Sequence, residues 1–271
     1  MNDIFKYRAP TSRAELFGLL ASHGEGAKIL AGGTDLLVDI RSGLVHPELV
    51  INLKKVQDFS GLVWSQSEGL IIGPATTVND VLHDARVREY YPLLAGCALT
   101  IASHQVRNRA TVIGNIVHAS PGADMAPGLL CLGARVRIAS QRGEREVCLK
   151  DFFTGVKRTV LRHDEIVEAI TVPPDTAKSR GAYRKLKRID GHDLALVSVA
   201  VTNTGSAVRV GIGAAAPTPL LVEGLSHQDP ADVVVAAALG VARPISDLRC
   251  SKEYREYMIE VFVRRLLEEV R

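Results

Sequence analysis

The sequence has no long apolar run: no stretch approaches the roughly 18 consecutive apolar residues that a membrane-spanning helix needs. Its first residues, MNDIFKYRAP, also lack the basic-then-apolar order of a secretory signal. With 271 residues, of which 46% are hydrophobic and 23% are charged, the composition is that of an ordinary globular chain. We therefore expect a cytoplasmic protein with no membrane span, built as one large domain or two smaller ones.

Closely spaced cysteines are missing as well. The four cysteines, Cys97, Cys131, Cys148 and Cys250, lie far apart, without a C-x-x-C pair or a histidine at ligand spacing. Iron–sulfur clusters and structural zinc need sulfurs close together, so we predict reduced thiols and no metal site. If electrons pass through this chain, it carries no metal centre of its own to move them.

The chain also lacks a basic stripe and a catalytic constellation. Its formal net charge is +3, and its Lys and Arg residues are scattered, which disfavours a nucleic-acid partner. The spacing supports no Ser-His-Asp or Cys-His arrangement, and the carboxylates form no evident pair. We therefore predict no catalytic side chain in this chain.

Apolar periodicity predicts an α+β fold in two parts. Pro173-Pro174 and the polar residues up to Lys178 form the clearest linker, because two prolines cannot continue a strand. We place a first domain at 1–174, with sub-lobes at about 1–55 and 56–174, and a smaller domain at 178–271. The predicted strands cover 28–30, 49–51, 70–72, 135–139, 165–172, 183–186, 195–201 and 208–212, and the predicted helices cover 12–22, 36–40 (a single turn), 78–84, 93–103, 229–239 (capped by Asp229) and 251–270.

A double glycine follows the strand predicted at 28–30. The segment Ala31-Gly32-Gly33-Thr34-Asp35-Leu36-Leu37 leads from that strand into a helical turn. Glycines let backbone N–H groups point inward with no Cβ in the way, and a helix start adds a positive dipole, which suits a diphosphate. The segment matches neither G-x-G-x-x-G nor the P-loop pattern, so a tight turn without a ligand stays the alternative.

A second informative segment, TVIGNIVHASPGAD, runs from Thr111 to Asp124 and is rich in small and polar residues. Long polar loops inside a compact fold usually carry function. Thr111, Asn115 and Ser120 offer short hydrogen-bonding side chains, and Asp124 offers a carboxylate suited to ribose hydroxyls. By itself the segment is equally compatible with a ligand-binding loop and with an elaborate turn.

Taken together, the two segments resemble the FAD-binding loops of the molybdopterin dehydrogenase flavoprotein family. The resemblance continues through Tyr183-Arg184-Lys185, through Asp193 to Ala200, and through the A-P-T-P turn within Gly211 to Pro219, so it covers nearly the whole chain in order. It implies a two-lobed FAD-binding domain of the vanillyl-alcohol-oxidase-like type. A smaller α+β domain with an antiparallel sheet and helices would follow it.

The resemblance also implies which residues bind FAD. The backbone of Ala31 to Leu37 and of Ile113 to Asn115 would hold the pyrophosphate, and Asp124 would bind ribose. Lys185 falls near the cofactor, and the loop at 193–194 falls where the family approaches the isoalloxazine ring. The predicted FAD site therefore consists of Ala31, Gly32, Gly33, Thr34, Asp35, Leu36, Thr111, Gly114, Asn115, Ser120, Asp124, Lys185, Asp193 and Leu194.

One residue departs from the family's pattern, and several neighbours have plainer interpretations. The family reads T-x-G-G-N, and Ile113 replaces the first glycine here. A β-branched side chain excludes most positive-φ conformations, so either Ile113 keeps ordinary β geometry or the loop sits slightly differently. His118 and His192 are minor candidates to face the flavin. Structural or solvated roles are expected for His104, Arg107, Arg109 and the Lys54-Lys55 pair.

The resemblance implies an electron-transfer role. This chain would be the FAD-carrying subunit of a molybdenum hydroxylase, passing electrons from the [2Fe-2S] clusters of a small subunit to NAD+, oxygen or another acceptor. A large subunit would bind the molybdopterin cofactor, which implies a heterotrimer, commonly doubled. Two alternatives stay open, namely a self-contained flavin oxidase and an assembly module that has lost FAD.

We predict that replacing both Gly32 and Gly33 with valine abolishes FAD retention, because the added side chains block the approach of backbone N–H groups to the diphosphate. Flavin absorbance of the purified double variant, compared with that of the wild type, measures the effect. Full flavin occupancy in the variant would place the diphosphate elsewhere.

Overall fold

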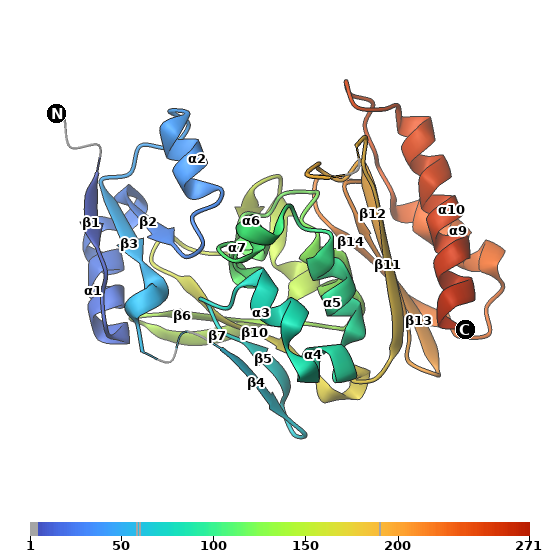
Figure 1. Ribbon diagram of the computed structural model, residues 1–271, viewed down its shortest axis with the longest axis horizontal. Helices are drawn as coiled ribbons and strands as arrows, with labels where there is room; N and C mark the ends of the chain where they lie inside the picture. Colours follow the sequence, from blue (N-terminus) through green and yellow to red (C-terminus); the bar gives the residue numbers. More distant parts are fainter. Residues whose placement is uncertain (1–4, 58, 60, 190) are drawn as a thin grey trace.

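The N-terminal lobe is a three-stranded parallel sheet in the order β1-β3-β2, with α1 packed against it (Figure 1). The computed structural model describes residues 5–57, 59, 61–189 and 191–271, so the first four residues of the predicted sub-lobe lie outside it. The hydroxyl of Ser12 accepts a hydrogen bond from the N–H of Glu15 at 3.2 Å and so caps α1. The elements are β1 (Lys6–Arg8), α1 (Arg13–His23), β2 (Ala27–Leu30), α2 (Leu36–Arg41) and β3 (Leu49–Asn52).

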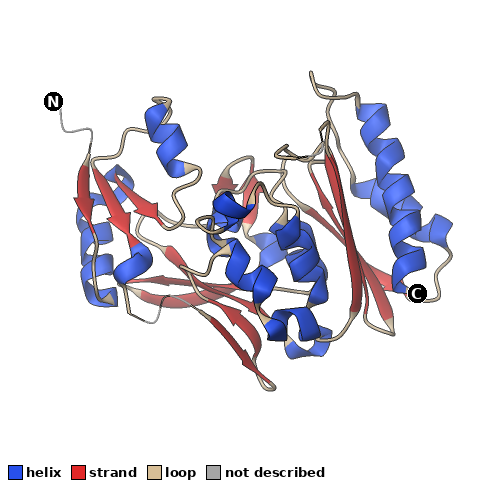
Figure 2. Ribbon diagram, in the orientation of Figure 1, coloured by secondary structure: helices blue, strands red, loops and turns tan. Residues whose placement is uncertain are grey.

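The middle of the chain forms an antiparallel five-stranded sheet in the order β4-β5-β10-β6-β7, covered by short helices (Figure 2). Leu70 and Ile138 of the sheet pack with Leu94 and Leu129 of the helices in one buried core. The strands are β4 (Leu62–Ser65), β5 (Gly69–Ile72), β6 (Arg135–Ser140), β7 (Gly143–Cys148) and β10 (Ile166–Val172), with a separate hairpin of β8 (Phe153–Gly155) and β9 (Arg158–Thr159). The helices are α3 (Val78–His83), α4 (Ala85–Tyr90), α5 (Pro92–Leu99), α6 (His104–Arg107), α7 (Val112–Val117) and α8 (Met125–Cys131).

The C-terminal part is a four-stranded antiparallel sheet in the order β11-β12-β13-β14, with α9 and α10 on its outer face (Figure 1). Strand β12 is buried on both sides: Val197, Val199 and Val201 pack in the cluster that includes α9 and α10, whereas Ala200 joins the core of the middle part. This division follows from the two-residue period of a strand. The elements are β11 (Arg180–Leu186), β12 (Val197–Asn203), β13 (Ala207–Gly213), β14 (Leu220–Ser226), α9 (Ala231–Val241) and α10 (Lys252–Val270).

Strand β13 lies directly against α8, and this contact joins the C-terminal sheet to the middle part. A Cβ added to Gly211 would lie 2.2 Å from the carbonyl oxygen of Pro127, so only glycine allows the two backbones to come this close. Arg209 donates to the carbonyl of Cys131 at 3.2 Å, and the thiol of Cys131 donates to the carbonyl of Ala200 at 3.5 Å. Burial raises the pKa of Cys131 to about 12, which keeps this thiol protonated.

The structure confirms the α+β class and the antiparallel C-terminal sheet with its helices. Element ends differ: the helix predicted over 93–103 ends at Leu99. The predicted cap Asp229 is wrong, because α9 begins at Ala231 after Pro230, and the Asp229 carboxylate instead accepts from the N–H of Ser226 at 2.8 Å. No helix among the described residues is long and apolar enough to cross a membrane. The helices and strands that the sequence pattern missed are β1, β4, β7, β8, β9, β14, α4, α6, α7 and α8.

We predict that Gly211→Ala lowers the free energy of unfolding by about 1–3 kcal/mol, because the added methyl group must push β13 away from α8. Urea unfolding followed by circular dichroism measures the change. Gly240→Ala is the matched control, since no atom lies within 4 Å of a Cβ placed on this helical glycine. The control should stabilise α9 by about 0.5–1 kcal/mol, and equal effects of the two variants would contradict the close-contact explanation.

Candidate functional site

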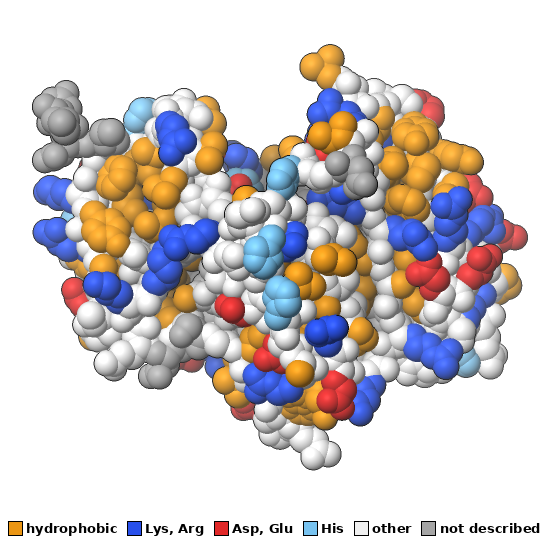
Figure 3. Space-filling model, viewed as in Figure 1, with side chains coloured by type: hydrophobic (Ala, Val, Ile, Leu, Met, Phe, Trp, Pro, Cys, Tyr) orange, Lys and Arg blue, Asp and Glu red, His pale blue; other side chains and the backbone are white. Residues whose placement is uncertain are grey.

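A cavity of about 650 Å³ lies where the N-terminal lobe, the middle helices and the C-terminal sheet meet. Figure 3 shows the surface hollowed between the N-terminal lobe and the C-terminal part. Segments that are far apart in the sequence line this cavity together, which the sequence alone could not establish. It is lined by every residue of the predicted FAD site, namely Ala31, Gly32, Gly33, Thr34, Asp35, Leu36, Thr111, Gly114, Asn115, Ser120, Asp124, Lys185, Asp193 and Leu194.

The first glycine segment forms the turn between β2 and α2. Gly33 has a φ of +77°, a conformation that favours glycine. A Cβ on Gly32 would lie 2.2 Å from the carbonyl oxygen of Arg109, so the turn rests directly on the backbone that precedes α7. Among the described residues, no protein acceptor lies in hydrogen-bonding geometry to the backbone N–H groups from Gly32 to Leu36. Unpaired amides lining a cavity can receive an anionic ligand.

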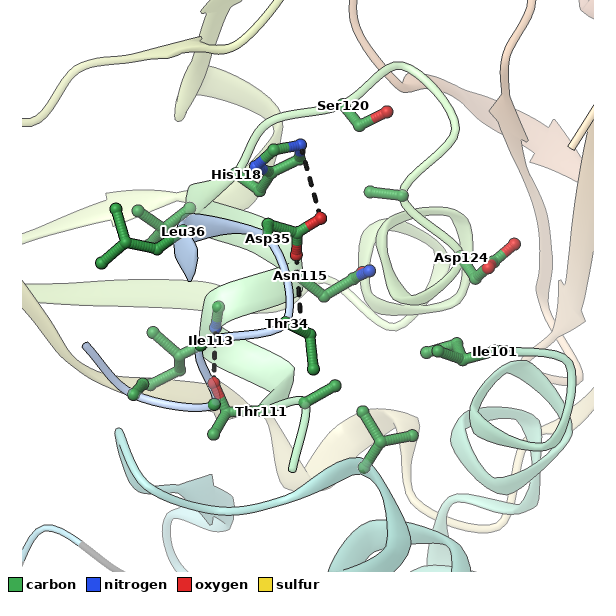
Figure 4. A pocket seen from close by; sticks show the side chains of 18 of the residues that line it. Thr34, Asp35, Leu36, Ile101, Thr111, Ile113, Asn115, His118, Ser120 and Asp124 are labelled. Carbon is green, nitrogen blue, oxygen red and sulfur yellow. Dashed lines mark hydrogen bonds and ion pairs between the residues drawn. The ribbon is translucent and has the colours of Figure 1, made fainter. Parts of the chain in front are cut away.

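The second segment is partly helical, because α7 begins directly after Thr111. The Thr111 hydroxyl caps this helix by accepting from the N–H of Gly114 at 3.0 Å (Figure 4). Ile113 therefore has helical backbone, which rules out the first of its two alternatives, ordinary β geometry. Its side chain is 5% exposed and lines the cavity. A helix imposes negative φ on every residue, which explains why a β-branched residue is accepted where the family has glycine.

Hydrogen bonds and one charge pair connect the two segments to each other and to their surroundings. The N–H of Met125 donates to the Asn115 side chain at 3.2 Å and so links α7 to α8. Figure 4 shows Asp35 and His118 pointing toward one another, with 3.9 Å between the Oδ1 and Nε2 atoms. This pair is an ion pair only when His118 is protonated. His118 therefore lines the cavity and contacts the first segment.

Lys54 contributes more than the expected surface role. Its Nζ donates to the carbonyl of Ala31 at 2.6 Å and so fixes the start of the first glycine segment. Partial burial, together with the nearby charge of Arg109, lowers the pKa of Lys54. No local pattern indicated this contact, because Lys54 lies 23 residues after Ala31.

A buried polar cluster on β11 reaches the cavity at Asp124. Lys185 Nζ donates to Asp124 Oδ2 at 2.8 Å, and the Tyr183 hydroxyl donates to Asp124 Oδ1 at 3.0 Å. Burial raises the pKa of Asp124, and the charge and hydrogen bonds of Lys185 partly offset that rise. Burial and the charge of Asp124 raise the pKa of Tyr183 well above its usual value, so the phenol stays protonated and donates. Tyr183 does not line the cavity, and the sequence did not predict its role.

The remaining candidates divide between the cavity and its surroundings. His192 lines the cavity beside Leu194, whose side chain is 64% exposed. His104 makes structural hydrogen bonds, as expected: its ring Nδ1 lies 3.3 Å from the Asn79 amide nitrogen, and its carbonyl accepts from the same amide at 3.2 Å. Arg107 donates to the carbonyl of Ile101 at 2.8 Å and is also structural. The apolar lining that sequence reasoning missed includes Ile29, Ile101, Val106, Leu161 and Val167.

Comparisons with known proteins support a single family over the whole chain. The family described as the FAD binding domain in molybdopterin dehydrogenase matches residues 3–175. The CO dehydrogenase flavoprotein C-terminal domain matches residues 181–270. The carbon monoxide dehydrogenase medium chain of Hydrogenophaga pseudoflava is 33% identical, with 97% of this chain and 96% of the relative covered. The xanthine dehydrogenase FAD-binding subunit of Escherichia coli O157:H7 is 30% identical, with 99% and 97% covered.

Solved structures give the same result. A chain in the crystal structure of the cyanide-inactivated Cu,Mo-CO dehydrogenase superposes with a TM-score of 0.91 at 31% identity, covering 98% of this chain and 97% of that one. A chain of quinoline 2-oxidoreductase from Pseudomonas putida 86 gives a TM-score of 0.88 at 28% identity, with 98% and 96% covered. This chain therefore shares its fold with these proteins.

We predict that Lys185→Met lowers the free energy of unfolding near neutral pH by about 3–5 kcal/mol, because it leaves the buried Asp124 carboxylate without its cation. The raised pKa of Asp124 means that, above the usual aspartate pKa, the folded chain holds a proton that the unfolded chain releases. The free energy of unfolding therefore falls as pH rises from the usual aspartate pKa to the raised pKa of Asp124 in the folded chain. The variant raises this pKa further and extends the fall to higher pH.

Urea unfolding of the wild type and Lys185→Met at several pH values between about 4 and 7 measures this dependence. The double variant Lys185→Met/Asp124→Asn is the control, since it removes the titrating group and should flatten the profile. Parallel profiles for Lys185→Met and the double variant would show that Asp124 is not the group responsible.

Proposed function

This chain belongs to the molybdopterin dehydrogenase flavoprotein family as an FAD-binding subunit, and we propose that it serves there as an electron relay. The family's members are parts of molybdenum-dependent oxidoreductases. The observation that carries the proposal is that both glycine-containing segments and Lys185 of β11 line one cavity. A relay subunit needs a bound flavin and an accessible edge, and it needs no acid–base side chain for substrate chemistry.

The residues around the cavity fit FAD. The backbone N–H groups from Gly32 to Leu36 have no protein acceptor among the described residues, and they suit the pyrophosphate. Asp124 uses each carboxylate oxygen once, for Lys185 and for Tyr183, which leaves lone pairs for a ribose hydroxyl. The cavity's volume of about 650 Å³ lies within the usual range for organic ligands.

When bound, FAD can exchange electrons singly or in pairs, and the protein's part is to bind it, orient it and control access. Ile101 and Ile113 are largely buried and give the cavity wall apolar surface. Lys185 keeps the buried Asp124 carboxylate paired. The exposed Leu194 marks an open side, at which we propose that the electron acceptor approaches.

We propose that the electrons come from outside this chain. Among the described residues, no group of three or more His, Cys, Asp or Glu side chains could hold a metal ion. We propose a [2Fe-2S] small subunit as the donor and a molybdopterin-binding large subunit as the place of substrate turnover. The name "medium chain" of the carbon monoxide dehydrogenase relatives supports such companions. NAD+, oxygen or another acceptor would receive the electrons, and this transfer would take place in the cytoplasm. Within the chain, the FAD-binding domain would cover residues 1–174 and the C-terminal domain residues 178–271.

We expect the purified chain to carry the absorption bands of bound flavin and to hydroxylate no substrate by itself. Adding the small and large subunits should restore turnover, measured as substrate-dependent reduction of an acceptor. Complete turnover by this chain alone would contradict the relay role, and a colourless preparation that takes up no added FAD would contradict FAD binding.

A further inference from the structure

Arg255 is the largest fully buried side chain in the described part of the protein, with 1% of the residue exposed. It projects from the first turns of α10, on the face that carries the buried residues Ile259 and Val263. Arginine stays charged in proteins, and burying a charge is costly unless hydrogen bonds replace the lost water. The hydrogen-bond partners of this guanidinium therefore indicate its structural role.

The guanidinium binds two backbone carbonyls that lie at the ends of different strands. Its Nη1 donates to the carbonyl of Leu196, directly before β12, and to the carbonyl of Ala214, directly after β13, the latter at 3.3 Å. Its Nη2 donates to Asp247 Oδ1 at 2.9 Å. Hydrogen bonds from Arg249 hold the pKa of Asp247 below its usual range, so the partner of Arg255 stays charged.

Both carbonyls belong to backbone that touches the FAD cavity wall. The segment leading into Leu196 contains Leu194, which lines the cavity. The N–H of Ala214 donates to the carbonyl of Pro121 at 2.6 Å. A Cβ on Gly122, another lining residue, would lie 3.9 Å from Ala195 and 4.0 Å from Ala214. Thus the two strand ends bound by Arg255 are also the ones that support the 120–124 segment and the 192–194 segment.

Strain at Ala214 makes this support necessary. Ala214 has a φ of +58°, in the left-handed region that residues with a Cβ adopt at a cost. Its N–H and its carbonyl are both occupied, by Pro121 and by Arg255. Without the guanidinium, one of the two contacts that hold this conformation is lost, and the contact with the second FAD segment loses its anchor.

We propose that Arg255 is a positioning residue for the FAD site, acting through Leu196 and Ala214 on the cavity wall formed by 192–194 and 120–124. The inference rests on the proposed FAD function. The three residues to which Arg255 donates, Leu196, Ala214 and Asp247, do not line the cavity, so its effect on the flavin passes through these two backbone segments.

The test compares Arg255→Met and Arg255→Lys with Val263→Ala in the full chain. Val263 is fully buried on the same face of α10 and lines no part of the cavity, so it reports destabilisation alone. The FAD dissociation constant is measured from the fluorescence of released flavin, and the thermal midpoint of each apoprotein is measured in parallel. The visible circular dichroism of bound flavin reports the geometry of its surroundings.

Arg255→Met should weaken FAD binding by about tenfold or more, the size of effect usual for residues that orient a binding group from behind, and should alter the flavin dichroism. The FAD affinity of Arg255→Lys should lie between those of Arg255→Met and the wild type, because an ammonium group can bind one carbonyl but cannot bind both carbonyls and Asp247 together. Val263→Ala should lose thermal stability and keep wild-type affinity and dichroism.

Equal FAD affinity in Arg255→Met and the wild type would overturn the proposal, and so would an equal loss of affinity in Val263→Ala at matched stability. If Arg255→Met does not fold, the FAD affinities of Arg255→Lys and Asp247→Asn are compared with that of the wild type by the same criterion. A wild-type chain that binds no FAD would instead refute the proposed function, so the two failures are distinguishable.

Discussion

Backbone-to-backbone contact at glycine sets the spacing of the parts that surround the cavity. At Gly32 the first segment rests on the carbonyl of Arg109, and at Gly211 strand β13 rests on the carbonyl of Pro127. In both places a Cβ would lie 2.2 Å from a backbone oxygen. Because the clash is with backbone, moving a side chain cannot relieve it. The first contact joins the N-terminal lobe to the middle part, and the second joins the C-terminal sheet to it. The cavity is the space left between surfaces held at these distances.

Buried charges provide the second level of organisation. Asp124 is paired with Lys185 and hydrogen-bonded to Tyr183, and Arg255 binds two carbonyls and Asp247. Each charge is costly to bury without a partner, so each arrangement tolerates few alternatives. Asp124 lies in the cavity wall, whereas Arg255 lies one layer behind it. The C-terminal sheet therefore contributes to the site both directly, through β11, and indirectly, through the ends of β12 and β13.

Much of the fold could be predicted from local pattern. Apolar alternation and helical spacing indicated α1, β3, β10, β12 and α10, because these elements bury one face or both. Short elements such as β1 and α7 could not be found in this way, because their conformation depends on neighbours: β1 pairs with β3, and α7 begins at a cap supplied by Thr111. The Asp229 error has a similar cause. A capping side chain is plausible at that position, but the chain before α9 turns so that Asp229 bonds Ser226 instead.

The sequence by itself determined the chemistry of this protein. The two glycine-containing segments favoured a diphosphate ligand, and their order, spacing and resemblance to a known flavoprotein family indicated FAD. Tertiary structure alone decided that residues as distant as Ala31, Asp124 and Leu194 line one cavity, that Ile113 lies in a helix, and that Lys54, Tyr183 and Arg255 support the site from behind. The physical reason is the sequence distance over which each interaction acts. Backbone propensity and glycine freedom act over a few residues and can be read locally, whereas a buried charge finds its partner wherever folding places one.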